Sequence, residues 1–201
     1  MVLSGPAGDV LPADVYRRLA ADLRSCRCRV MVDLCGARLD AALAGHVDIV
    51  KISHEELLAD GRISSTDSKE IVAAMRRIRD AGADTVIVTR AEQPLLLLRA
   101  DDSVLVVTNP RMEVVDTSGA GDSFTAAVVA MLAQGADLVD AVVLGAAAGA
   151  LNVTRHGRGT GDAAAIRRLS ALVRTARYGA DVDEVPASVR LDELPGILEI
   201  E

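Results

Sequence analysis

Short runs of apolar residues alternate along the first ninety positions with segments whose apolar residues recur at helical spacing. The runs predict buried strands over 29–34, 47–52 and 84–89. The helical spacing predicts helices over 14–23 and 64–81, with shorter ones over 39–43 and 55–57. Strands that alternate with helices in this way are typical of βαβ units. The pattern therefore predicts an α/β fold with a mostly parallel sheet.

The pattern changes after Thr89. Three closely spaced strands are expected over 94–99, 103–108 and 112–115, and residues 100–102 join the first two as a hairpin. Two alanine-rich helices are expected over 123–134 and 138–154, and a glycine-rich loop over 157–161 leads to a helix that Asp162 caps and that runs to Arg174.

The chain ends in a segment of different composition. Residues 177–201 carry two prolines and seven acids, which leaves a docked strand and a mobile segment as alternatives. We expect residues 1–175 to form one domain and residues 176–201 to form an acidic tail.

Composition limits the classes of partner. The 201 residues are enough for one well-buried α/β domain, and half of them are hydrophobic while 1% are aromatic, so Ala, Val and Leu build the core. A net charge of −7 argues against binding to nucleic acid, whose phosphates require a basic surface. An anionic nucleotide must then be held by local backbone donors and a metal ion.

Cysteines and targeting signals indicate the compartment. Cys26, Cys28 and Cys35 are odd in number and lack zinc-site spacing, so we interpret them as reduced thiols. No charged and then apolar leader opens the sequence, and no apolar run reaches the ~18 residues of a membrane span. The expectation is a soluble cytoplasmic protein without a membrane partner.

The most informative segment is 114–124, in which two valines and an acid precede a turn of small residues. Gly119, Ala120 and Gly121 leave their backbone N–H groups unshielded at the start of a predicted helix, where such groups bind anions. Asp122 lies in the same first turn. Backbone donors beside a carboxylate suit phosphoryl transfer to an alcohol. Taken alone, the glycines would fit a plain tight turn.

This segment also resembles a known signature. Residues 116–122 (Asp-Thr-Ser-Gly-Ala-Gly-Asp) are similar to the second signature of the ribokinase-like PfkB carbohydrate kinases. Residues 33–39 resemble the Asp-x-x-Gly-x-x-Leu of that family, residues 51–57 its Lys-Pro-Asn-x-x-Glu-Leu, and residues 88–92 its nucleotide-edge Thr-x-Gly segment. These motifs resemble those of the phosphosugar branch of the family, 1-phosphofructokinase and tagatose-6-phosphate kinase, more than those of ribokinase itself.

The resemblance implies a fold as well as a chemistry. It implies a ribokinase-like three-layer α/β/α architecture with a mostly parallel sheet. The likeness covers the C-terminal part of the family, so the N-terminal strands and the β lid over the sugar are expected to be missing. A sheet without its first strands exposes an edge, and we expect a partner or a homo-oligomer to cover it.

The resemblance assigns roles within the glycine-rich segment. Asp122 would be the catalytic base that takes the proton of a sugar hydroxyl, against the alternative of an acid favoured only by the helix dipole. Gly119, Ala120 and Gly121 would form the anion hole. Asp116 and Thr117 would shape the turn, and their backbone would face a monovalent cation.

Further roles fall on the neighbouring motifs. Glu56 would help to hold Mg²⁺ through water, against the alternative of a solvated helix acid, and its family partner Asn is replaced here by Ser53. Thr89 and Arg90 would lie near the nucleotide phosphates, and Glu92 would also belong to the nucleotide site. For Arg90 the alternative is a rim arginine.

The last nucleotide contacts come from the C-terminal part. Asn152 and Gly157 match the segment that borders the adenine. His46 and His54 are interpreted as surface residues, and His156 as a polar residue of a loop.

Two functions follow from the resemblance. The first is ATP-dependent phosphorylation of a sugar or sugar phosphate, with Mg²⁺ and a monovalent cation. The alternative is a shortened, non-catalytic relative that binds a nucleotide or a partner. A Rossmann oxidoreductase and a P-loop NTPase are disfavoured, because the sequence lacks G-x-G-x-x-G and G-x-x-x-x-G-K-[ST] motifs.

Overall fold

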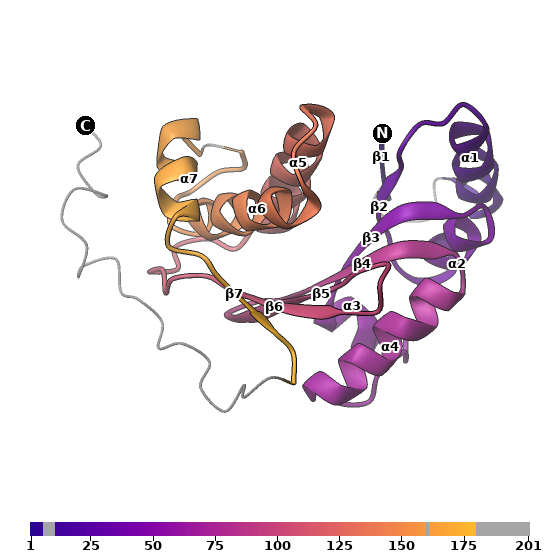
Figure 1. The fold of residues 1–201 in the computed structure, drawn as a ribbon, viewed down its shortest axis with the longest axis horizontal. Helices are drawn as coiled ribbons and strands as arrows, with labels where there is room; N and C mark the ends of the chain where they lie inside the picture. The colour runs from indigo at the N-terminus through magenta and orange to yellow at the C-terminus, as the bar shows by residue number, and fades with distance from the viewer. Residues whose placement is uncertain (6–10, 160, 180–201) are drawn as a thin grey trace. The chain divides into compact units, whose positions relative to one another are not determined.

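The computed structural model describes residues 1–5, 11–159 and 161–179. It divides the chain into two compact units, Met1–Val106 and Val107–Glu201. The described strands follow the order β1-β2-β3-β4-β5-β6-β7 in one sheet. Figure 1 shows the elements, and each unit is described by itself.

The first unit is built on parallel strands. They are β1 (Val2–Ser4), β2 (Met31–Asp33), β3 (Val47–Ser53) and β4 (Ala83–Arg90). Each pairs in parallel with the next. The last three confirm the strands expected from the apolar runs, whereas β1 was not predicted as a strand. The α/β prediction is confirmed.

Four helices connect these strands. They are α1 (Asp14–Ser25), α2 (Gly36–Ala44), α3 (His54–Ala59) and α4 (Ser68–Asp80). In Figure 1, α1, α2 and α4 follow one another along one side of the parallel strands. This is the arrangement that right-handed crossovers produce between consecutive neighbouring strands. The apolar face of α4 is buried at helical spacing through Ile71, Ala74, Met75 and Ile78.

The start of α4 differs from the prediction. The helix was expected from Ser64, but it begins at Ser68, and Asp67 caps it by accepting the Lys69 N–H at 2.7 Å. The Glu70 carboxylate accepts the N–H and hydroxyl of Ser64 at 2.6 and 2.8 Å. It accepts the same two groups of Ser65 at 3.1 and 2.6 Å. These bonds hold the preceding residues in a loop instead of a helical turn.

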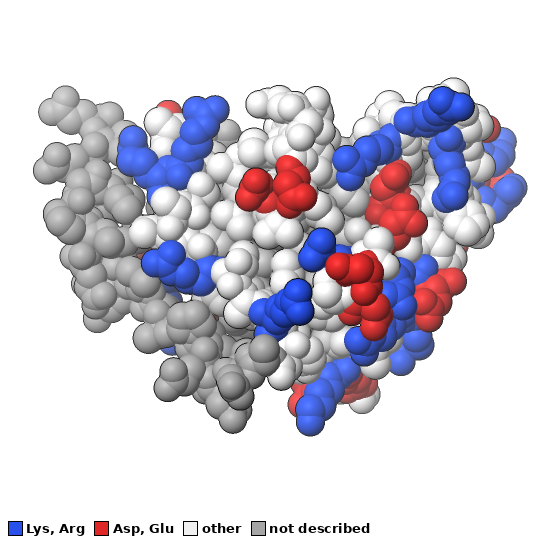
Figure 2. Space-filling view, in the orientation of Figure 1, with Lys and Arg blue, Asp and Glu red and all other residues white. Residues whose placement is uncertain are grey.

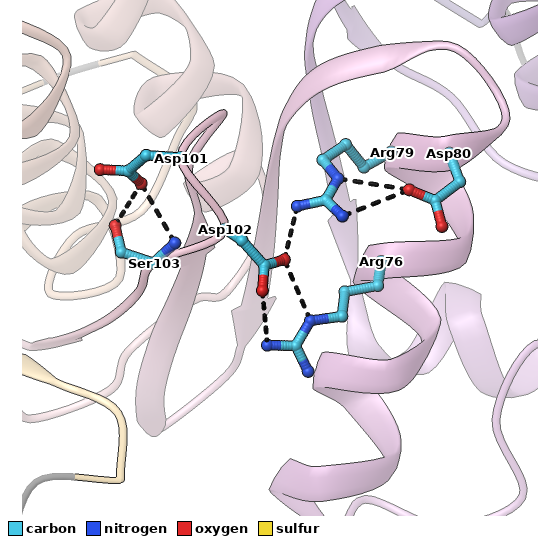
Figure 3. A network of polar contacts seen from close by, with 6 residues as sticks. All are labelled: Arg76, Arg79, Asp80, Asp101, Asp102 and Ser103. Atoms are coloured by element: carbon cyan, nitrogen blue, oxygen red, sulfur yellow. Dashed lines mark hydrogen bonds and ion pairs between the residues drawn. The ribbon is translucent and has the colours of Figure 1, made fainter.

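A hairpin completes the first unit. Strand β5 (Gln93–Leu98) pairs antiparallel with β4, and the turn at Asp102 leads from β5 to β6 (Val104–Thr108), as predicted. Figure 3 shows that Asp102 binds two arginines of α4, with 3.2 Å to Arg76 Nε and 2.6 Å to Arg79 Nη1. Asp102 and Arg76 are about half exposed and Arg79 is partly buried, so the ion pairs position the turn against α4 and contribute modestly to stability.

The second unit is mainly helical. Its elements are α5 (Ala120–Ala133), α6 (Leu138–Asn152), α7 (Ala163–Ser170) and β7 (Arg174–Arg177). The two alanine-rich helices and the Asp162 cap, which accepts the Ala165 N–H at 2.7 Å, confirm the predictions. The C-terminal residues 180–201, most of the predicted acidic tail, lie outside the described residues.

Two predictions for this unit are wrong. No strand forms over 112–115, because the N–H of Val115 bonds the carbonyl of Val153 at 2.7 Å instead of a neighbouring strand. The helix expected to reach Arg174 ends at Ser170. The amides of Leu172 and Val173 bond carbonyls three residues back, which tightens and ends the helix.

Within the described ranges, no helix has the length and apolar character that crossing a membrane requires.

The loop before α4 generates a prediction about pH. Hydrogen bonds from Ser65 and Ser64 lower the pKa of Glu70 from 4.5 to about 2. A carboxyl with a lowered folded pKa stabilises the fold above its unfolded pKa and loses that contribution as the pH falls through the folded value. We expect this contribution to disappear between about pH 4.5 and pH 2. Carbon-detected NMR titration of the Glu70 carboxyl measures the pKa on which this expectation depends.

The control is Ser65→Ala, which should move the pKa of Glu70 back toward 4.5. A Glu70 that titrates near 4.5 in the unchanged protein contradicts the proposed loop contacts.

Candidate active site

The N-terminus of α5 is formed by the glycine-rich segment. Gly119 precedes the helix in the left-handed conformation, with φ of 79°, and contributes no capping side chain. Asp122 lies in the first helical turn and is exposed to solvent. This places a carboxylate beside uncapped backbone donors, as the sequence predicted.

The backbone hydrogen bonds show that the amides of the predicted anion hole are not equally available to a ligand. The Ala120 N–H donates to the Thr117 carbonyl at 3.3 Å, and the Ser123 N–H donates to the Gly119 carbonyl at 2.9 Å. The amides between them belong to the first turn of the helix, whose N–H groups have no acceptor within the helix. The amides of Gly121 and Asp122 are therefore best suited to an anion, with Ala120 partly committed to the turn.

The residues before the turn are fixed to the end of α6. The N–H of Asp116 donates to the Val153 carbonyl at 3.1 Å, while its carboxylate accepts the Ser118 N–H at 2.9 Å. The Ser118 hydrogen bonds, with smaller contributions from His156 and Arg158, lower the pKa of Asp116. Asp116 therefore links the end of α6 to the turn that precedes α5.

The loop after α6 meets the same turn. Asn152 is 1% exposed, and its side chain contacts the 118–123 segment and the loop amide of Gly159. Gly157 is exposed, with φ of 98°. A Cβ on Gly119 would lie 2.9 Å from Cγ of Arg158, so this arginine packs over the turn. The sequence analysis missed Arg158, although its position between Gly157 and Gly159 was a signal.

Small residues bring α5 and α6 close together. A Cβ on Gly145 would lie 2.5 Å from Cγ2 of Val128 and 3.0 Å from the Phe124 carbonyl. A Cβ on Gly149 would lie 3.1 Å from the Ala120 carbonyl. Because Gly145, Gly149 and Asn152 recur at helical spacing, one face of α6 both contacts α5 and presents the Asn152 amide to it.

The predicted nucleotide residues of the first unit lie at the β4–β5 turn. Thr89 is half-buried near the end of β4, and Glu92 is exposed in the turn. The guanidinium of Arg90 is buried, and it donates to the Thr66 carbonyl at 3.3 Å and to the side chain of Gln93. Ala91 has φ of 52°, the conformation that the family glycine would adopt more easily.

The predicted metal residue Glu56 is part of a helix cap. Its carboxylate accepts the Ser53 N–H at 2.7 Å, and its own N–H donates to the Ser53 hydroxyl at 3.1 Å. This reciprocal pair is a capping box, which explains how serine serves in the place of the family asparagine. One carboxylate oxygen of Glu56 is thus already occupied by the protein.

A buried ion pair lies at the carboxyl ends of β2 and β3. Lys51 Nζ is 3.0 Å from both oxygens of Asp33, and the two side chains are 8% and 13% exposed. They are partners in the parallel register. Removing either charge would leave the other poorly compensated, so this pair holds the strand ends of the first unit.

Several predicted residues therefore gather within one unit. The second unit brings together the glycine-rich turn 119–121 and Asp122 with Asp116, Asn152 and the loop of Gly157. Glu56, Thr89, Arg90 and Glu92 belong to the first unit.

The donor set has consequences for a metal ion. Within the described residues, no group of three or more His, Cys, Asp or Glu side chains could hold a metal by itself. Mg²⁺ bound by a single carboxylate, water and substrate phosphates fits such a donor set, since Mg²⁺ commonly keeps several waters. The residues present fit that kind of magnesium site around Glu56.

The sequence is similar to a defined family and to curated proteins. The family described as pfkB family carbohydrate kinase matches residues 2–164. The bifunctional protein HldE of Gluconobacter oxydans is 34% identical over 160 residues, which are 80% of this chain and 33% of that protein. The 1-phosphofructokinase of Bacillus subtilis is 29% identical over 160 residues, 80% of this chain and 52% of that enzyme. The chain thus spans about a third to a half of these relatives.

Solved structures show the same fold. Phosphofructokinase-2 from Escherichia coli in complex with potassium superposes with a TM-score of 0.76 at 28% identity, covering 85% of this chain and 55% of that one. Arabidopsis thaliana ribokinase complexed with ribose and ATP gives 0.70 at 22% identity, covering 84% and 55%. The predicted ribokinase-like α/β fold is confirmed.

The close contact of α5 and α6 generates a prediction. Gly145→Ala should lower the free energy of unfolding by about 1–2 kcal/mol. The new methyl overpacks a fixed helix contact at a cost of up to about 3 kcal/mol, and the ~1 kcal/mol that alanine contributes to a helix over glycine offsets part of it. Urea unfolding measures it.

The control is Gly149→Ala, whose nearest contact of 3.1 Å is longer than the 2.5 Å at Gly145. It should destabilise less. A Gly145→Ala protein as stable as the unchanged one would contradict the packing.

Proposed function

This chain belongs to the pfkB family of carbohydrate kinases, and on that premise we propose that it transfers the terminal phosphoryl group of ATP to a hydroxyl of a sugar or sugar phosphate. The observation that carries the proposal is the exposed Asp122 in the first turn of the uncapped α5. The similarity to the 1-phosphofructokinase of Bacillus subtilis supports a phosphosugar such as fructose 1-phosphate as the acceptor.

Each residue of this turn has a task in the proposed reaction. The alcohol oxygen attacks the phosphoryl group as the carboxylate of Asp122 takes its proton. The backbone amides of Gly121 and Asp122 hold the transferring group, with Gly119 and Ala120 shaping the same hole.

Cofactors belong to the same proposal. ATP supplies the phosphoryl group, and Mg²⁺ neutralises its phosphates, with Glu56 contributing through water. Thr89, Arg90, Glu92 and the loop at Gly157 are proposed nucleotide contacts. A monovalent cation beside Asp116 and Thr117 is supported by the potassium complex of the Escherichia coli relative. A cytoplasmic location is also part of the proposal.

A second function is the alternative of a non-catalytic relative that binds a nucleotide or a partner. Such a protein would use the amides of the α5 turn for binding without the transfer chemistry. ATP binding without turnover of any sugar would favour this second function.

The test of the first function is a single substitution. Asp122→Asn should lower the turnover number about 100-fold or more, because the alcohol loses its proton acceptor. The assay combines the purified chain, magnesium and ATP with a panel of sugars that includes fructose 1-phosphate, and detects ADP by coupled oxidation of NADH.

The matched control is Asp140→Asn. Asp140 is the third residue of α6, as Asp122 is of α5, and both are exposed acids in a first helical turn. If Asp122 acts only on the helix dipole, the two variants will behave alike. Loss of turnover in Asp122→Asn alone supports catalysis, and unchanged turnover in both refutes it.

We also propose a homo-oligomer. β1 is the terminal strand in the sheet order, and unpaired strand edges favour association. The tetrameric inhibited form of phosphofructokinase-2 from Escherichia coli is a precedent in a relative. Size-exclusion chromatography with light scattering should give a mass of at least two chains. A stable monomer over a wide concentration range would contradict the proposal.

A further inference from the structure

One buried side chain connects three parts of the second unit. Asn152, the last residue of α6, is 1% exposed. Its Nδ2 donates to the Ser118 carbonyl at 2.9 Å. Its Oδ1 accepts the Ser123 hydroxyl at 3.0 Å and the Gly159 N–H at 3.2 Å. Because a carbonyl faces the nitrogen and two donors face the oxygen, the orientation of the amide is chemically determined.

The partners of Asn152 bracket the catalytic turn. Ser118 immediately precedes Gly119, and Ser123 immediately follows Asp122. One amide therefore fixes both ends of the four-residue segment 119–122. The third partner, Gly159, connects the same amide to the loop that carries Arg158 over Gly119.

The chemistry of the site requires an amide. The Ser118 carbonyl needs a donor, and the Ser123 hydroxyl and Gly159 N–H need an acceptor. A buried polar group left without its partner costs about 1–3 kcal/mol. A side-chain amide offers a donating nitrogen and an accepting oxygen without a charge, which matches these three partners. Alanine would remove the side-chain partner of all three groups.

We propose that Asn152 is a positioning residue for phosphoryl transfer: it keeps the amides of the α5 N-terminus and the carboxylate of Asp122 in one fixed arrangement. This inference rests on the proposed kinase function for its kinetic consequence. Buried as it is, Asn152 acts through the turn and not by contact with the nucleotide. Catalytic groups lose efficiency steeply when their orientation relaxes.

The first experiment is independent of activity. Hydrogen exchange by NMR follows the amides of Ala120, Ser123 and Gly159, all hydrogen-bonded in the structure. Asn152→Ala should accelerate their exchange about tenfold or more, because the turn opens locally. The control is Thr154→Ala. The Thr154 hydroxyl donates to the Leu151 carbonyl at 2.8 Å, away from the three amides, so this variant should leave their exchange unchanged.

Two further variants each remove a single hydrogen bond of Asn152, and they also provide a test if Asn152→Ala does not fold. Asn152→Asp keeps the acceptor oxygen and loses the donor, so Gly159 should stay protected while Ala120 exchanges faster. Ser123→Ala removes the bond from the residue 123 side chain to Asn152 Oδ1. It should accelerate exchange of the backbone amide at position 123 and leave that of Gly159 unchanged. The proposal is overturned if Asn152→Ala, or Asn152→Asp where the alanine variant does not fold, exchanges like Thr154→Ala at every one of these amides.

Kinetics give the second readout. On the sugar that the panel identifies, Asn152→Ala should lower kcat about 30-fold while KM for the sugar changes less than about threefold, since orientation and not binding is lost. An equal loss in Thr154→Ala would mean a general structural effect and would overturn the positioning role. If the unchanged chain phosphorylates no sugar, the proposed function fails, and the exchange experiment alone decides whether Asn152 holds the turn.

Discussion

At its N-terminus α5 presents backbone N–H groups without a capping side chain, because the residue before the helix is Gly119 in a left-handed conformation. Such groups need an acceptor, and a protein that leaves them open at a solvent-facing turn favours an anion there. In the proposed function, the exposed Asp122 would lie next to that anion. The glycines of α6 allow that helix to pack closely against α5, and the amide of Asn152 bonds the turn before α5, so both maintain this arrangement.

The net charge of the chain makes local donors necessary. With a formal charge of −7, long-range attraction does not concentrate nucleotides at the surface. Figure 2 shows basic and acidic side chains interspersed over the face of the first unit that it presents. Recognition of a phosphate therefore depends on short-range hydrogen bonds from oriented amides and on a cation, as in the proposed function.

Much of this could be predicted from the sequence because the decisive signals are local. The apolar runs gave β2, β3 and β4, and small residues beside acids gave the turn of 116–122. The predictions failed where a specific hydrogen bond outweighs the preference that the apolar pattern indicates. The strand expected over 112–115 is lost to the Val153 carbonyl, and α4 starts late because the loop before it bonds Glu70. The role of Asn152 depends on Ser118, 34 positions earlier, and periodicity carries no information about such a pair.

The exchange of asparagine for serine at position 53 links helix formation to ligand binding. Glu56 closes the reciprocal cap of the six-residue α3 with Ser53, so the same carboxylate serves secondary structure and the proposed magnesium site. Any cation that withdraws this oxygen from the Ser53 amide loosens the first turn of α3, and any loosening of that turn frees the oxygen. Formation of the first turn of α3 and binding of a cation at Glu56 are then thermodynamically coupled, so a change in one changes the other.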